Sequence, residues 1–104
     1  MSGTKSTSFY FLDRKISINV IEEETPLNDA FLEVSPIKEY NLTFTKKGAF
    51  TTKVVIHETW HLFFDILASF NEESFSFSEL SKEIYTYAFE TLYSKIKENL
   101  EILC

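Results

Sequence analysis

Cysteine is almost absent from this sequence. Cys104 is the only one, so no disulfide can form within the chain and nothing indicates an oxidising compartment. The opening stretch, MSGTKSTS, lacks the apolar segment of a signal peptide, and no run of about 18 apolar residues, the length that spans a bilayer, occurs anywhere. We therefore expect a soluble, cytoplasmic protein.

Basic residues are also scarce. The chain contains ten Lys and Arg but sixteen Asp and Glu, which gives a net charge of -6. The lysines are scattered along the sequence apart from Lys46-Lys47. Nucleic-acid phosphates and anionic membrane surfaces repel such a chain. We therefore expect neither a nucleic acid nor a membrane as the partner, and the oligomeric state stays open.

Apolar side chains, by contrast, are plentiful. They make up 44% of the 104 residues, and aromatic residues alone make up 16%. A chain of this length can bury one compact core and has no room for a second. The sequence thus predicts one globular domain over residues 9–104, preceded by a flexible polar tail over residues 1–8.

Two regions show the alternation of apolar and polar residues that is typical of half-buried strands. The segment FYFLDRKISINV predicts a hairpin with a break at residues 13–15, and YNLTFT, residues 40–45, predicts a further strand that ends at Lys46-Lys47-Gly48. Both prolines fall between these regions, in residues 25–39. That segment is expected to be a connection with a short helical turn around residues 28–34.

The pattern then changes to the spacing of three and four residues that predicts helices, first over residues 52–69 and then over residues 78–100. The expected fold class is α+β, with a short antiparallel sheet packed on two helices. The two histidines of the chain, His57 and His61, both fall in the first predicted helix.

These histidines form the motif His57-Glu58-x-x-His61. On a helix, residues four apart project from the same face, so both imidazoles can bind one ion, and two imidazoles suit Zn²⁺. A catalytic zinc site has a third protein ligand and leaves its fourth position to water. Glu58 would lie beside the ion, where a carboxylate can take a proton from that water and pass it to a leaving amine.

The third ligand must come from another part of the chain. Glu83 is the first candidate, because it borders the apolar stripe of the second predicted helix and should face the first. Glu79, one turn earlier, is the main competitor. Asp65, one turn after His61, is a weaker candidate for a different role. Its carboxylate could accept a hydrogen bond from a metal-binding imidazole and so fix the orientation of that ring.

The segments VVIHETWHLFFDIL and EIYTYAFETL together resemble the zincin metallopeptidases of the gluzincin type, in which an HExxH helix is completed by a Glu on the next helix. More narrowly, they look like the small phage-type zincin-like peptidases. The resemblance covers roughly residues 40–93. It implies a minimal zincin-like domain, a zinc-dependent hydrolase acting on a peptide or protein substrate, and a location in the host cytoplasm if the chain is phage-encoded.

The resemblance also assigns roles to individual residues. Glu58 matches the catalytic base, and Tyr87 matches the aromatic residue after the third ligand. Tyr87 would have to steady the oxyanion, with Tyr85 or Tyr40 as alternatives. For the YNLTFT strand two roles stay open: the resemblance implies a sheet edge that receives an extended substrate, and the alternative is a strand that simply pairs with the N-terminal hairpin. The metal ligands implied by the resemblance are His57, His61 and Glu83.

Two other functions compete with the peptidase. The first is a zincin-fold binding module, inactive or weakly active, that acts through a protein partner; Trp60, inside the motif, and the many aromatic residues could form its binding surface. The second is a structural protein in which the HExxH match is accidental, since this motif is short. The zinc content of the purified protein distinguishes the structural protein from the peptidase and the binding module.

Overall fold

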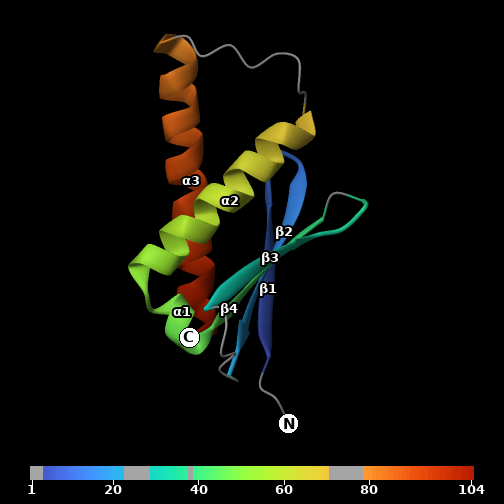
Figure 1. Cartoon of the computed structure of the whole chain (residues 1–104), viewed down its shortest axis with the longest axis vertical. Helices are drawn as coiled ribbons and strands as arrows, with labels where there is room; N and C mark the ends of the chain where they lie inside the picture. Colours follow the sequence, from blue (N-terminus) through green and yellow to red (C-terminus); the bar gives the residue numbers. More distant parts are fainter. Residues whose placement is uncertain (1–3, 23–28, 38, 71–78) are drawn as a thin grey trace.

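A four-stranded sheet covered on one face by two long helices makes up the fold (Figure 1). The computed structural model describes residues 4–22, 29–37, 39–70 and 79–104. One mixed sheet with helices confirms the α+β class. The elements in chain order are β1 (Lys5–Phe11), β2 (Arg14–Ile21), β3 (Ala30–Val34), β4 (Tyr40–Thr45), α1 (Lys46–Ala49), α2 (Thr52–Phe70) and α3 (Glu79–Leu103).

The predicted N-terminal hairpin is confirmed as β1 and β2. Phe11 pairs with Arg14, so the turn consists of Leu12 and Asp13 and overlaps the predicted break at Asp13. Both turn residues have positive φ, 49° and 62°, as a type I′ turn requires to match the twist of its strands. β1 begins at Lys5, inside the segment expected to be a tail, because residues 5–8 pair with β2.

The prediction of a purely antiparallel sheet is wrong. The strand order is β1-β2-β4-β3, and β2 runs parallel to β4. The reason is β3, which pairs antiparallel with the outer side of β4 and reverses the chain before β4 enters the sheet. The helical turn predicted around residues 28–34 is therefore also wrong from Ala30 onward, and residue 28 lies outside the described residues.

The position of β4 corrects a further expectation. β4 is hydrogen-bonded to β2 on one side and to β3 on the other, so it is an inner strand. It cannot offer a free edge to a substrate peptide, which was one of the two roles considered for YNLTFT. The other role, pairing with the N-terminal hairpin, is confirmed by the pairing of β4 with β2. The free edges of the described sheet belong to β1 and β3.

A tight junction joins β4 to the helices. The Asp29 carbonyl accepts hydrogen bonds from the Thr45 backbone N–H (2.9 Å) and hydroxyl (3.1 Å). The Thr45 hydroxyl oxygen in turn accepts from the Gly48 N–H at 3.0 Å, which caps the short α1. Gly48 is buried directly against Asp29, where a Cβ would lie 2.1 Å from the carbonyl oxygen. Only glycine fits at this position.

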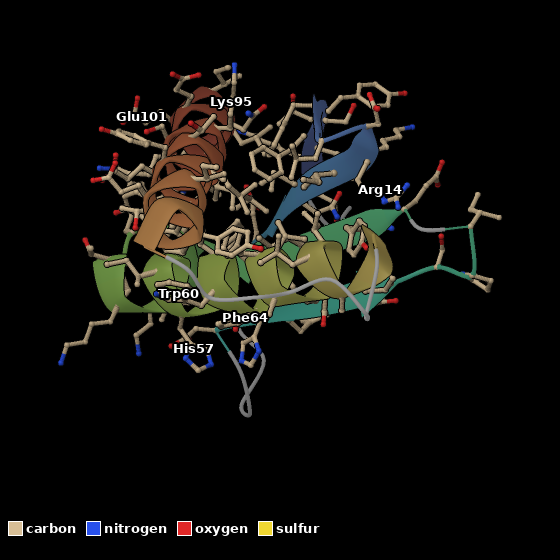
Figure 2. All side chains as sticks on the ribbon, turned by 90° about the horizontal axis from the view of Figure 1, so that it is seen from above. Arg14, His57, Trp60, Phe64, Lys95 and Glu101 are labelled. Atoms are coloured by element: carbon tan, nitrogen blue, oxygen red, sulfur yellow. The ribbon has the colours of Figure 1, made fainter. Side chains whose placement is uncertain are left out.

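The two long helices share one face of the sheet, with α2 against β3 and β4 and α3 against β1 and β2 (Figures 1 and 2). The predicted helix over residues 52–69 is confirmed by α2, and the second predicted helix by α3. Neither helix, nor any other in the described residues, has the length and apolarity of a membrane span. The core between helices and sheet includes Ile16, Ile18, Leu42, Phe44, Leu62, Ile66, Leu92 and Ile96.

Candidate metal centre

The two histidines lie side by side on the outer face of α2. Their Nε2 atoms are 2.9 Å apart and their ring centroids 4.5 Å apart, with the ring planes at 77°. Both side chains are exposed, and Figure 2 shows His57 on the side of α2 that faces away from α3. The arrangement follows from the spacing of four residues, which places both imidazoles on one helical face.

This separation is close to what a shared metal ion needs. With Zn–N bonds of about 2.0–2.1 Å and a tetrahedral angle, the two nitrogens lie about 3.3 Å apart. The observed 2.9 Å is shorter by about 0.4 Å, a difference that small rotations of the imidazoles can remove. The two histidines therefore fit a divalent ion as a pair of ligands.

Glu58 occupies a different environment from the histidines on either side of it. One residue advances a helix by about 100°, so its side chain turns away from His57, and it is only 9% exposed. Glu58 has no hydrogen bond or ion pair with another described residue. Among the described residues, no buried side-chain polar atom lacks a hydrogen-bond partner. The carboxylate oxygens therefore keep contact with solvent.

Glu83 does not join the two histidines. It is exposed near the start of α3, and the described side chains contain no group of three or more His, Cys, Asp or Glu that could hold a metal ion. α3 meets α2 through Phe89, whose ring stacks on Trp60. Glu83 lies six residues before that contact, roughly 9 Å along the helix axis. The side chain of the competing candidate, Glu79, lies outside the described residues.

The remaining predicted site residues are also spread over the molecule. Tyr87 is 67% exposed on α3, and Tyr85 is half-buried beside the core. Tyr40 is buried beneath α2, and its hydroxyl lies 3.5 Å from the Asp65 carbonyl oxygen. The Asp65 side chain is exposed. Within the described chain, only the HExxH segment itself brings predicted site residues together.

An exposed aromatic surface adjoins the histidines on α2. The Trp60 ring stacks between Phe64, at 5.4 Å, and Phe89, at 4.0 Å. Trp60 is 42% exposed and Phe64 58% exposed, and Figure 2 places both near His57. We call Trp60 and Phe64 the aromatic face. Phe64 was not among the residues singled out from the sequence, although its position four residues after Trp60 was the available signal.

A pocket of about 380 Å³ lies elsewhere, between α1, the start of α2 and the end of α3. Its lining includes apolar side chains such as Phe50 and Tyr93 and the charged side chains of Lys97 and Glu101. None of the residues predicted to bind metal or perform catalysis lines it.

Comparison with known proteins does not extend the resemblance to the zincins. No protein-family model matches the sequence, and no curated protein or solved structure matches it significantly. The assignment to a zincin-like peptidase therefore remains a prediction from the residues of the motif.

Proposed function

We propose that this chain binds a zinc ion through His57 and His61. The observation that carries the proposal is the 2.9 Å separation of their Nε2 atoms on an exposed helical face. Neutral imidazole is a preferred zinc ligand, and the pair needs little rearrangement to hold one ion. The ion would add positive charge to a chain with a net charge of -6.

Peptide hydrolysis is the first candidate use of that ion, and the HExxH spacing favours it. A zinc ion supplies polarisation of a peptide carbonyl and a more acidic bound water. The carboxylate of Glu58 would accept the proton and deliver it to the leaving amine. Its position next to His57 and the absence of a partner among the described residues support this role.

The number of protein ligands limits the case for peptide hydrolysis. Catalytic zinc ions generally have three protein ligands, and the described side chains supply two. Glu83, the predicted third ligand, would have to move with the start of α3 toward the opposite side of α2. We therefore keep Glu83 as a proposal and derive no catalytic step that needs it.

A protein-binding module is the second candidate, and the aromatic face favours it. Trp60 and Phe64 together expose stacked rings beside the histidines. Exposed aromatic residues of this kind are enriched at protein interfaces, where they bury a large apolar area. In such a module the zinc ion joins two protein surfaces and no peptide bond is broken.

Zinc titration by calorimetry tests the proposal. Metal-free wild-type protein should bind Zn²⁺, and His57→Ala or His61→Ala should weaken binding at least about tenfold, because one of two ligands is lost. Lys95→Ala is the control, since Lys95 is exposed on α3 and lies far from the histidine pair (Figure 2), and it should bind zinc like the wild type. Wild-type protein that binds no zinc, or histidine variants that bind it equally well, would contradict the proposal.

A further inference from the structure

The histidine pair offers half of the ligands of a closed zinc site. Structural zinc ions are almost always tetrahedral with four protein ligands. In the part of the chain that the structure describes, no further His, Cys, Asp or Glu joins His57 and His61. The ligands that complete the site must then come either from side chains of this chain outside the described residues, such as that of Glu79, or from a second molecule.

We infer that a second copy of this chain completes the site, so that zinc bridges two molecules through His57 and His61 of each. This inference rests on the proposed zinc binding and names its partner. Two exposed pairs related by a twofold axis through the ion supply four imidazole nitrogens, and a self-complementary surface is the usual basis of a symmetric dimer. With four nitrogens bound, no position is left for water.

The surface around the histidines suits a second copy. The aromatic face adjoins the pair, so a twofold axis through the ion that relates antiparallel α2 helices brings the Trp60 side chains of both molecules toward one another. The same axis places Phe64 of each copy at the level of Val54 of the other. Burial of these rings supplies the apolar contact that two histidines cannot supply alone. His57 faces away from α3, so the histidine side of α2 is clear of α3, whereas Trp60 also contacts Phe89 of α3.

Charge favours one orientation of the two helices. Lys53 lies four residues before His57, and Asp65 lies four residues after His61; both are exposed. An antiparallel pair of α2 helices centred on the ion places Lys53 of one copy at the level of Asp65 of the other. A parallel pair would place like charges at the same level, which is unfavourable. We therefore expect antiparallel α2 helices.

Sedimentation velocity with zinc titration tests this inference on the 104-residue chain. Metal-free protein should sediment as a 12.2 kDa monomer, and zinc should convert it to a species of twice that mass with one ion per two chains. A chelator should reverse the change. Because Cys104 is exposed and can bind metal or oxidise, the dimer must also form in Cys104→Ser under reducing conditions.

Three substitutions locate the interface. Phe64→Ser should weaken zinc-dependent dimerisation at least about tenfold, the effect of removing an aromatic anchor from an interface. Phe50→Ser is the matched control, because Phe50 is 70% exposed outside α2, and it should leave dimerisation unchanged. His57→Ala should abolish the zinc-dependent dimer.

The outcomes separate this inference from the proposed function. One zinc ion per chain with a monomer mass overturns the dimer and leaves zinc binding intact. No zinc binding at all overturns both. A zinc-dependent dimer that survives His57→Ala, or that responds equally to Phe50→Ser and Phe64→Ser, overturns the interface assigned to α2.

Discussion

Glu58 is the residue whose role separates the two candidate uses of the metal. Glu58→Gln keeps the size of the side chain and removes the carboxylate that can accept a proton. Zinc affinity should stay within about twofold, since Glu58 is not a proposed ligand, whereas any zinc-dependent peptide cleavage should fall at least about 100-fold, the usual contribution of a general base. Calorimetry and a peptide-library digest read by mass spectrometry measure the two effects.

Glu90→Gln is the control for this substitution, because Glu90 is an exposed glutamate on α3. It should change neither zinc affinity nor cleavage. Cleavage that persists in Glu58→Gln would remove Glu58 from the role of base. If the chain is only a binding module, Glu58→Gln leaves the affinity for its partner unchanged.

Single residues also show how far the site could be predicted. The convergence of His57 and His61 follows from a spacing of four residues within one helix, which is local information. The distance of Glu83 from them depends on which turn of α3 meets α2. That turn carries Phe89, which stacks on Trp60 and also contacts Phe63. These contacts join residues far apart in sequence, so no local pattern encodes them.

The same difference between local and long-range information decides which helices and strands could be predicted from the sequence. α2 and the β1–β2 hairpin were predicted because helical spacing and strand alternation are visible within a few turns or a few residues. β3 was not, because residues 30–34 show no clear period and become a strand by pairing with β4. The parallel pairing of β2 and β4 follows from β3, so missing one strand made the sheet topology wrong.

The junction between β4 and α1 gives a prediction at this scale. Gly48→Ala would place a methyl group 2.1 Å from the Asp29 carbonyl oxygen. That atom belongs to the backbone and is held by two hydrogen bonds from Thr45. The substitution should therefore lower the free energy of unfolding by about 1–3 kcal/mol, the usual cost of overpacking. Urea denaturation followed by the fluorescence of Trp60 measures it.

Lys47→Ala is the control at the neighbouring position. The Lys47 side chain is exposed, so this change should shift the unfolding free energy by no more than about 0.5 kcal/mol. An unchanged stability of Gly48→Ala would mean that the Asp29 backbone yields at little cost. The junction would then not fix the position of β3 beside β4.

At the scale of the whole molecule, the net charge of -6 affects any self-association. Two chains and one Zn²⁺ carry a total of -6 - 6 + 2 = -10. Raising the salt from about 0.01 M to about 0.15 M shortens the screening length from about 30 Å to about 8 Å. Repulsion between the chains weakens, so the zinc-bridged dimer should become tighter by a few-fold.

Sedimentation velocity at constant free zinc and increasing salt checks this expectation. A dimer that loosens as salt is added would show that local attraction, such as that between Lys53 and Asp65, outweighs the repulsion between whole chains. The monomeric control is His57→Ala, whose sedimentation should be insensitive to zinc at every salt concentration.

The inner position of β4 has a consequence for the order in which the native molecule opens. An inner strand loses its hydrogen bonds only when its neighbours separate, so β4 belongs to the part that opens last. α2 follows β4 after only the short α1, and it packs on β3 and β4. The first described turns of α3, with Glu83, Ile84 and Tyr87 exposed, can open much earlier. We therefore expect His57 and His61 to stay in place when the start of α3, which carries the predicted third ligand Glu83, unfolds locally.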